Sequence, residues 1–263
     1  MPDPEQDLAL IERAARAAGE LALRHFRQPV EVWEKAGQGP VSAADLAVET
    51  MLREELGAAR PAYGWLSEET PDDPVRLEAR RLFIVDPIDG TRAYLAGDTG
   101  FSTSIAVAEE GRVTAAVVHL PAREETYVAT LGHGARRNGR PLAGSGRGTL
   151  DDATALCARR QLDPELWPGG RPNVARHFRS SLAWRLCLVA AGRFDLMLTF
   201  RETFDWDVAA GSLIAAEAGV RVSDGQGAPL AFNRSRPKQD GIIAAPPALH
   251  RALLDLRLGR PAD

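Results

Sequence analysis

The sequence predicts an α/β protein whose N-terminal half is of the α+β kind. Apolar residues recur with helical spacing over 5–27 and again over 46–56, ahead of a block of strand-like segments. In the second half, strand-like and helix-like segments alternate, which favours an α/β layer. The chain has 263 residues, 44% of them hydrophobic and 26% charged, so it is long enough to bury a sizeable core.

The N-terminal half is predicted to begin with the two helices and to continue as an antiparallel block. Glycine and proline at 37–40 interrupt the chain, and Ser42 followed by Asp45 is typical of a capped helix start. Asn138-Gly139 predicts a tight hairpin. Strands are expected at 82–85, 102–108, 113–119 and 125–131.

The C-terminal half is predicted to start at the glycine-rich connector 144–148, which divides the chain into domains 1–146 and 147–263. Helices are expected at 181–191 and 206–218, ended by Gly192 and Gly219. Strands are expected at 154–158, 195–200, 220–223 and 241–245. The tail after Pro246 carries no clear pattern.

Composition and charge argue against nucleic-acid and membrane partners. The net charge of −4 is spread along the chain, so no nucleic-acid polymer is expected. No segment approaches the roughly 20 apolar residues of a membrane span, and the acidic N-terminus lacks a signal core, which predicts a cytoplasmic protein without a membrane partner. Cys157 and Cys187 lie in apolar runs and are predicted to be buried thiols.

The segment Asp86-Pro-Ile-Asp-Gly-Thr91 suggests a metal site. A buried strand delivers Asp86 to its carboxyl end, and Asp89 follows three residues later, so both side chains can converge on one point. Two such carboxylates repel each other unless a cation lies between them, and oxygen ligands of this kind suit Mg²⁺. Gly90 lets backbone N–H groups approach a ligand closely. Read alone, the hexapeptide is equally compatible with an ordinary turn.

Further acidic residues stand where the chain changes direction: Asp45, Glu68, Glu69 and Asp207. Each has an ordinary explanation, because an acid in a first helical turn favours the helix dipole and a Glu-Glu pair in a loop is usually solvated.

Taken together, these motifs resemble the inositol monophosphatase superfamily. The matching segments occur in the family's order: Pro40-Val-Ser-Ala-Ala-Asp45, Glu68-Glu69, Asp86 to Thr91 and Trp206-Asp-Val-Ala-Ala210. The resemblance implies a layered αβαβα sandwich of the sugar-phosphatase type, with the site at the seam between its halves. It also implies a Mg²⁺-dependent phosphatase with two or three ions, and a possible homodimer.

The resemblance assigns a role to each matching residue. The metal ligands would be Glu68, Asp86, the carbonyl oxygen of Ile88, Asp89 and Asp207. The catalytic residues would be Asp45, Thr91 and Glu68, with Thr91 and Asp45 deprotonating the attacking water. The substrate phosphate would contact Gly90, Thr91, Asp89 and Asp207. Ser42 stands where the family often has Thr, and Glu69 would act from behind the ligands.

Two rival functions are weighed against this interpretation. A haloacid-dehalogenase type of phosphatase opens its motif with Asp-x-Asp-Gly-Thr, but Pro87 occupies the position of the nucleophile here. A regulatory member of the same fold that binds RNA or protein is the non-enzyme alternative. The presence of every expected metal ligand favours the enzyme.

The substrate is predicted from weaker signals. Inositol phosphatases of the family carry a Glu about six residues before the motif Trp, where this chain has Phe200, with Glu202 nearby. Segments 63–70 and 181–190 resemble bacterial 3'(2'),5'-bisphosphate nucleotidases of the CysQ kind. The predicted reaction is therefore removal of the 3'-phosphate of 3'-phosphoadenosine 5'-phosphate, with inositol 1-phosphate or a related sugar phosphate as the alternative substrate.

A bisphosphate would need a second anion pocket. Its candidates are Arg179, Arg185 and Arg201, each of which would otherwise be a surface ion-pair partner. Trp184 could stack on an adenine, but its helical spacing with Leu188 favours core packing.

Overall fold

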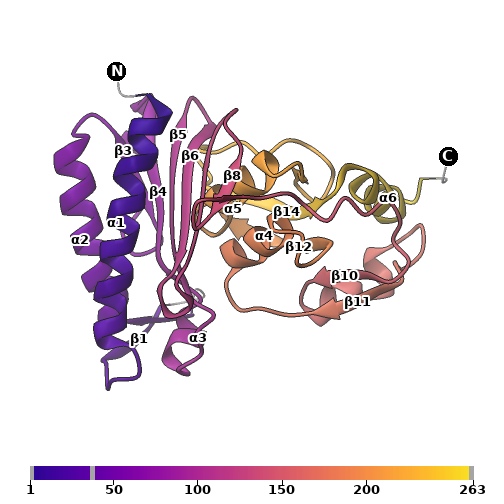
Figure 1. Cartoon of the computed structure of the whole chain (residues 1–263), viewed down its shortest axis with the longest axis horizontal. Helices are drawn as coiled ribbons and strands as arrows, with labels where there is room; N and C mark the ends of the chain where they lie inside the picture. The colour runs from indigo at the N-terminus through magenta and orange to yellow at the C-terminus, as the bar shows by residue number, and fades with distance from the viewer. Residues whose placement is uncertain (1–2, 36–38, 261–263) are drawn as a thin grey trace.

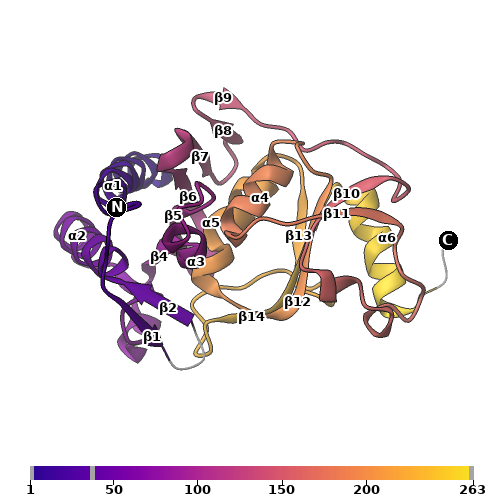
Figure 2. The same cartoon turned by 90° about the horizontal axis from the view of Figure 1, so that it is seen from below.

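The computed structural model describes residues 3–35 and 39–260; Gly37, in the predicted break, lies outside them. Five layers follow one another along the long axis of the molecule (Figures 1 and 2). They are two N-terminal helices, a seven-stranded sheet, two central helices, a five-stranded sheet and a C-terminal helix. This order confirms the expected αβαβα sandwich.

The first layer consists of α1 (Pro4–His25) and α2 (Ala43–Ala59). The buried stripe of α1, including Leu10, Ile11 and Ala18, packs against the sheet. At the start of α2, the Ser42 and Asp45 side chains bond each other's backbone N–H groups, which confirms the predicted cap. Two antiparallel strands, β1 (Val32–Lys35) and β2 (Gly39–Ser42), precede α2, and neither was predicted.

The seven-stranded sheet has the order β3-β4-β5-β6-β7-β8-β9. Its strands are β3 (Gly64–Ser67), β4 (Arg81–Asp89), β5 (Ser102–Glu109), β6 (Arg112–Leu120), β7 (Glu125–Thr130), β8 (Ala135–Arg137) and β9 (Arg140–Pro141). Only the β3–β4 pair is parallel; the other neighbours are antiparallel, as predicted for this block. The Asn138-Gly139 hairpin joins β8 to β9. Short helix α3 (Thr91–Leu95) follows β4.

The central layer consists of α4 (Leu182–Ala190) and α5 (Asp205–Glu217), which lie between the two sheets. Every residue of α4 is buried, because apolar layers cover both of its sides. The two helices pack closely at Gly211, where an added Cβ would lie 2.7 Å from the Leu186 side chain.

The five-stranded sheet has the order β11-β10-β12-β14-β13. Its strands are β10 (Ala153–Leu156), β11 (Val174–His177), β12 (Leu196–Phe204), β13 (Arg221–Ser223) and β14 (Lys238–Ala245). The sheet is mixed: β10 pairs in parallel with β11 and β12, whereas β14 pairs antiparallel with β12 and β13. Helix α6 (Pro247–Leu258) covers its outer face, in the tail where the sequence showed no pattern.

Four short 3-10 helices complete the described chain: Pro74–Glu78, Pro121–Arg123, Arg159–Leu162 and Pro164–Leu166. Within the described residues, no helix combines the length and apolar character needed to cross a bilayer. Cys157 and Cys187 are buried free thiols, as predicted.

The largest buried cluster draws on both halves of the chain. It contains Leu82 and Val118 from the first sheet, Leu186 and Ile214 from the central helices, and Ile242 from the second sheet. The central helices therefore bury apolar surface of both sheets at once. The division into domains at residue 146 stays a prediction.

Candidate active site and metal centre

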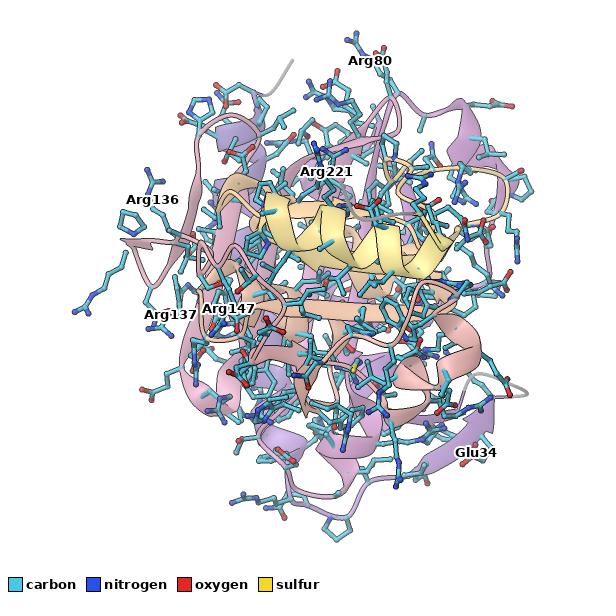
Figure 3. All side chains as sticks on the ribbon, turned by 90° about the vertical axis from the view of Figure 1, so that its right-hand side faces the viewer. Glu34, Arg80, Arg136, Arg137, Arg147 and Arg221 are labelled. Carbon is cyan, nitrogen blue, oxygen red and sulfur yellow. The ribbon has the colours of Figure 1, made fainter. Side chains whose placement is uncertain are left out.

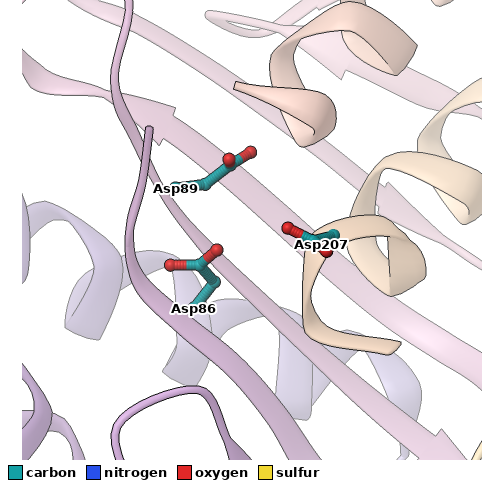
Figure 4. Close-up of side chains that lie close together, drawn as sticks. All are labelled: Asp86, Asp89 and Asp207. Atoms are coloured by element: carbon teal, nitrogen blue, oxygen red, sulfur yellow. The ribbon is translucent and has the colours of Figure 1, made fainter. Parts of the chain in front are cut away.

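Three aspartates from distant parts of the sequence meet at the seam between the first sheet and the central helices. Asp86 and Asp89 lie at the end of β4, where a register shift against β5 separates them. Asp207 lies in the first turn of α5. One carboxylate oxygen from each lies within 4.8 Å of the others (Figure 4). The convergence expected of the first two acids is therefore present, and a third completes it.

Of the aspartate cluster, as we call Asp86, Asp89 and Asp207, the first two are buried and the third is half-buried, and no ion pair to any of them is found among the described residues. Asp86 is 1% exposed, and its Oδ1 has no hydrogen-bond partner among the described residues. Burial, followed by the charges of Glu68, Asp89 and Asp207, raises the pKa of Asp86 well above its usual range. A divalent cation would supply the missing partner for this oxygen and remove the repulsion. The residues present therefore fit a Mg²⁺ site.

Glu68 follows β3, which was not predicted as a strand, and it lies outside the group of acids whose oxygens are within 4.8 Å of one another. Parallel pairing with β4 continues into Glu68, whose N–H donates to the Val85 carbonyl oxygen at 3.3 Å. Its side chain lines the same pocket as the aspartate cluster. Burial, then the charges of Asp207 and Glu69, raises the pKa of Glu68 to about 8. A carboxylate in this position also requires a cation to stay ionised at neutral pH.

Lys35 on β1 fixes the Glu68-Glu69 segment from outside. Its Nζ donates to the Glu68 carbonyl oxygen at 2.9 Å and forms an ion pair with the Glu69 carboxylate. Glu69 thus points to Lys35 and supports the backbone that carries Glu68. This placement agrees with the position expected for Glu69 behind the ligands.

Asp89 is held by the N-terminus of α4. Its Oδ2 accepts hydrogen bonds from Ser181 Oγ at 2.6 Å and the Ala183 N–H at 2.8 Å, and its Oδ1 accepts one from the Leu182 N–H at 3.3 Å. Ser181 also caps α4 by accepting from the Trp184 N–H at 2.9 Å. A helix beginning near Ser181 was predicted, but its link to Asp89 was not, because the two residues are distant in the sequence.

Asp45 and Thr91 form a second polar pair beside the aspartate cluster. Thr91 Oγ1 lies 3.2 Å from Asp45 Oδ1 and 3.2 Å from the Ile88 carbonyl oxygen. Asp45 is 1% exposed, and its Oδ2 accepts from the Ser42 N–H at 2.8 Å and from Ser42 Oγ. Burial raises the pKa of Asp45 against these hydrogen bonds. Ser42 supplies the hydroxyl donor that a Thr would supply, so the substitution keeps the pair intact.

Gly90 has the backbone conformation that lets backbone N–H groups approach a ligand closely, as expected. Its φ of +98° lies in the left-handed region, and an added Cβ would meet the Gly100 carbonyl oxygen at 3.3 Å. Thr91 begins α3, so the first N–H groups of this turn have no helical acceptor. These donors are available to an anion.

The acids line a pocket of about 340 Å³. Its other walls carry two cations and three aromatic rings, contributed by Arg92, Arg201, Phe178, Phe204 and Trp206. The Phe204 and Trp206 rings are stacked, with centroids 4.4 Å apart. The pocket therefore joins a concentrated negative charge to cationic and aromatic walls, which suits an anionic ligand only once cations occupy the acids.

The predicted second-anion residues separate in space. Arg201 lines the acid-lined pocket and Arg179 a neighbouring one. Arg185, expected to be a surface ion-pair partner if not an anion ligand, is buried and donates to the Arg179 and Ser180 carbonyl oxygens at 2.6 and 3.4 Å. That expectation is wrong, because the side chain braces the segment before α4. Trp184 is 4% exposed, which confirms core packing.

Comparison with known proteins decides the family. The model of the inositol monophosphatase family matches residues 3–259. The chain belongs to the inositol monophosphatase family.

Members of this family are metal-dependent phosphatases that hydrolyse phosphomonoesters, typically with Mg²⁺. The chain is 35% identical to an inositol-1-monophosphatase of Mesorhizobium japonicum, over 94% of each protein. It is 32% identical to the 3'(2'),5'-bisphosphate nucleotidase CysQ of Escherichia coli, over 83% of this chain and 90% of that protein. The solved inositol monophosphatase of Thermotoga maritima superposes with a TM-score of 0.82 at 28% identity, over 97% of each chain. Inositol monophosphatases and CysQ-type nucleotidases are thus both among the relatives.

Proposed function

We propose that this inositol monophosphatase family member removes the 3'-phosphate of 3'-phosphoadenosine 5'-phosphate, with Mg²⁺ held by carboxylates from both halves of the chain. Glu68, Asp86 and the Ile88 carbonyl oxygen would hold one ion. Asp86, Asp89 and Asp207 would hold another, and a third ion is compatible with the same pocket. Bound Mg²⁺ neutralises the phosphoryl charge, lowers the pKa of water and stabilises the departing alkoxide.

The chain's own residues position the reactants. The backbone N–H groups of Gly90 and Thr91 would donate to the substrate phosphate, because the turn leaves them without helical acceptors. A water that attacks phosphorus must lose a proton. The Thr91 hydroxyl, 3.2 Å from Asp45 Oδ1, would accept a hydrogen bond from this water and pass its own proton toward Asp45. Water attacks directly in this scheme, without a phosphorylated enzyme.

The ion pairs of Glu202 are the observation on which the proposed substrate depends. In the family's inositol phosphatases, a Glu about six residues before the motif Trp would accept hydrogen bonds from the hydroxyl groups of the inositol ring. Here Glu202 forms ion pairs with Arg236 and, at 3.6 Å, with Lys238, and it does not line the acid-lined pocket. Phe200, at the family's own position, packs against Trp167 with ring centroids 5.3 Å apart. These contacts support a substrate other than inositol phosphate.

The pocket walls favour a nucleoside over a sugar. Phe178 lines the pocket and is 49% exposed, so it offers an open ring face. The stacked Phe204–Trp206 pair lies on the same pocket. An adenine ring can stack on such surfaces with a gain of about 1–3 kcal/mol.

The test compares two substrates on the same protein. Mg²⁺-dependent phosphate release would be measured for 3'-phosphoadenosine 5'-phosphate and for inositol 1-phosphate. We expect kcat/KM to be at least tenfold higher for the nucleotide. A higher value for inositol 1-phosphate would overturn the substrate and leave the phosphatase assignment in place.

A further inference from the structure

A second pocket adjoins the acid-lined one. It has a volume of about 320 Å³ and is lined by three arginines, Arg123, Arg179 and Arg193, and by Trp184. We call it the arginine pocket. Phe178 and Ser180 line both pockets, so the two share a wall. The two pockets therefore lie side by side.

The arginine pocket carries excess positive charge. Arg123 and Arg193 share one carboxylate, that of Glu125, at 3.6 Å each, which is longer than an ordinary hydrogen bond. Arg137 approaches the same carboxylate at 4.0 Å. The other acid on the wall, Asp98, is exposed, and its Oδ1 accepts from the Gly100 N–H at 2.8 Å. Three arginines thus face two carboxylates, so the lining keeps a net positive charge that favours an anion.

Arg179 is oriented before any ligand arrives. It makes no ion pair among the described residues, and its one hydrogen bond goes to the Phe178 carbonyl oxygen at 2.6 Å. Its guanidinium lies 5.7 Å from the ring centroid of Trp184 and 5.5 Å from that of Phe194. The Arg185 side chain holds the backbone of Arg179 in place by donating to the Arg179 carbonyl oxygen. The planar group is therefore held between rings with N–H donors to spare.

Trp184 adds a donor without an acceptor. Its side chain is buried and lines the pocket, and its indole Nε1–H has no hydrogen-bond partner among the described residues. Arg123 lies over its ring at 4.8 Å. A buried donor of this kind is costly unless a ligand or water accepts from it.

From these observations we propose that the arginine pocket binds the second phosphate of a bisphosphate substrate. The proposal rests on the function proposed above and adds the binding site for the group that is not hydrolysed. The phosphate to be cleaved lies at the aspartate cluster, Phe178 contacts the connecting nucleoside, and Arg123, Arg179 and Arg193 take the 5'-phosphate. Arginine is suited to this role because its fork of N–H donors matches phosphate oxygens.

The experiment separates binding of the second phosphate from hydrolysis of the first. Arg123→Gln, Arg179→Gln and Arg193→Gln would be assayed with 3'-phosphoadenosine 5'-phosphate and with adenosine 3'-monophosphate, which lacks the 5'-phosphate. Loss of one charge-assisted contact should raise KM for the bisphosphate roughly 10- to 100-fold. KM for the monophosphate and kcat for both substrates should change less than about twofold, and Arg→Lys variants should recover part of the loss.

Controls keep the result interpretable. Arg221→Gln removes an exposed arginine on β13, labelled in Figure 3, that lines neither pocket, and it should leave both KM values unchanged. Each variant would be checked for an unchanged melting temperature and molecular mass in solution. Equal KM changes for both substrates, no change for either, or an altered oligomeric state with unchanged KM would overturn the arginine pocket. Poor hydrolysis of the bisphosphate by the unmodified protein would instead overturn the proposed substrate.

Discussion

At the scale of residues, the central feature is a set of acids that repel one another unless a cation binds. Asp86, Asp89, Asp207 and Glu68 all have raised pKa values, and in each case burial is the largest cause. A protein gains nothing in stability from such an arrangement when it is empty. The loss of stability caused by burying these acids together is explained if they bind a metal ion.

Asp207 is the cleanest residue for testing the metal centre, because Asp89 also caps α4. We expect Asp207→Asn to lower kcat at least about 100-fold at any practical Mg²⁺ concentration, since the amide is a poorer metal ligand. Steady-state phosphate release measured across a Mg²⁺ titration checks this. Asp240→Asn, an exposed change on β14, is the matched control. Near-normal activity of Asp207→Asn would remove this residue from the site.

The same acids predict how pH affects the metal-free protein. In the folded state the pKa is raised to about 8 for Glu68 and to about 7 for Asp207, so folded protein keeps protons that unfolded protein has lost. Stability must then fall as pH rises through this range. Burial lowers the pKa values of His119 and His250 to about 4. These two residues make stability rise with pH, but only at pH values below their ordinary pKa of 6.5. The window from about pH 6.5 to 8 therefore reports on the acids.

We expect the melting temperature in EDTA to fall between pH 6.5 and 8, and excess Mg²⁺ to remove most of the fall, because the ion stabilises the ionised carboxylates. Glu68→Gln should flatten the profile in EDTA. Thermal unfolding followed by circular dichroism measures both effects. Parallel profiles with and without Mg²⁺ would show that these acids do not hold the ion.

At the scale of elements, the N-terminus of α4 links the two parts of the site. It binds Asp89 through Ser181 Oγ and two backbone N–H groups, so a helix of the second half orients an acid of the first. The arrangement resembles a capping interaction made across the fold. Through these bonds the position of α4 determines the position of the Asp89 carboxylate.

Ser181→Ala tests this link. We expect a loss of about 1 kcal/mol in the free energy of unfolding, as for other lost caps. We also expect a higher Mg²⁺ concentration for half-maximal activity, since Asp89 loses the bond that orients it. Urea unfolding and Mg²⁺ titrations measure the two effects. Asp3→Ala, which removes the cap of α1, should lower stability without changing the Mg²⁺ requirement; an equal change in both variants would contradict the link.

Local signals explain which elements could be predicted. The capped start of α2 at Ser42 and the apolar strand before Asp86 were predictable because neighbouring residues determine both. The four-residue strand β3 was missed because its register depends on parallel pairing with β4. Helix α6 was missed because its apolar face becomes meaningful only against the second sheet. Tertiary contacts define both of these elements.

At the scale of the whole molecule, the layered fold brings acids from the first sheet and from central helix α5 to one seam. The sequence indicated the acids themselves because their motifs are local. It did not indicate the arginine pocket, because Arg123 follows β6 whereas Arg179 and Arg193 flank α4. Of its three arginines only Arg179 was a candidate. Figure 3 shows a further group, Arg136, Arg137 and Arg147, along one edge of the molecule.

The most direct test of the account is to locate the ions. Crystals grown with Mn²⁺ in place of Mg²⁺ would be measured at a wavelength where manganese scatters anomalously. We expect at least two anomalous peaks in the acid-lined pocket, one among Asp86, Asp89 and Asp207 and one bound by Glu68 and Asp86. Full Mn²⁺-supported activity with no peak beside these carboxylates would contradict the proposed metal centre.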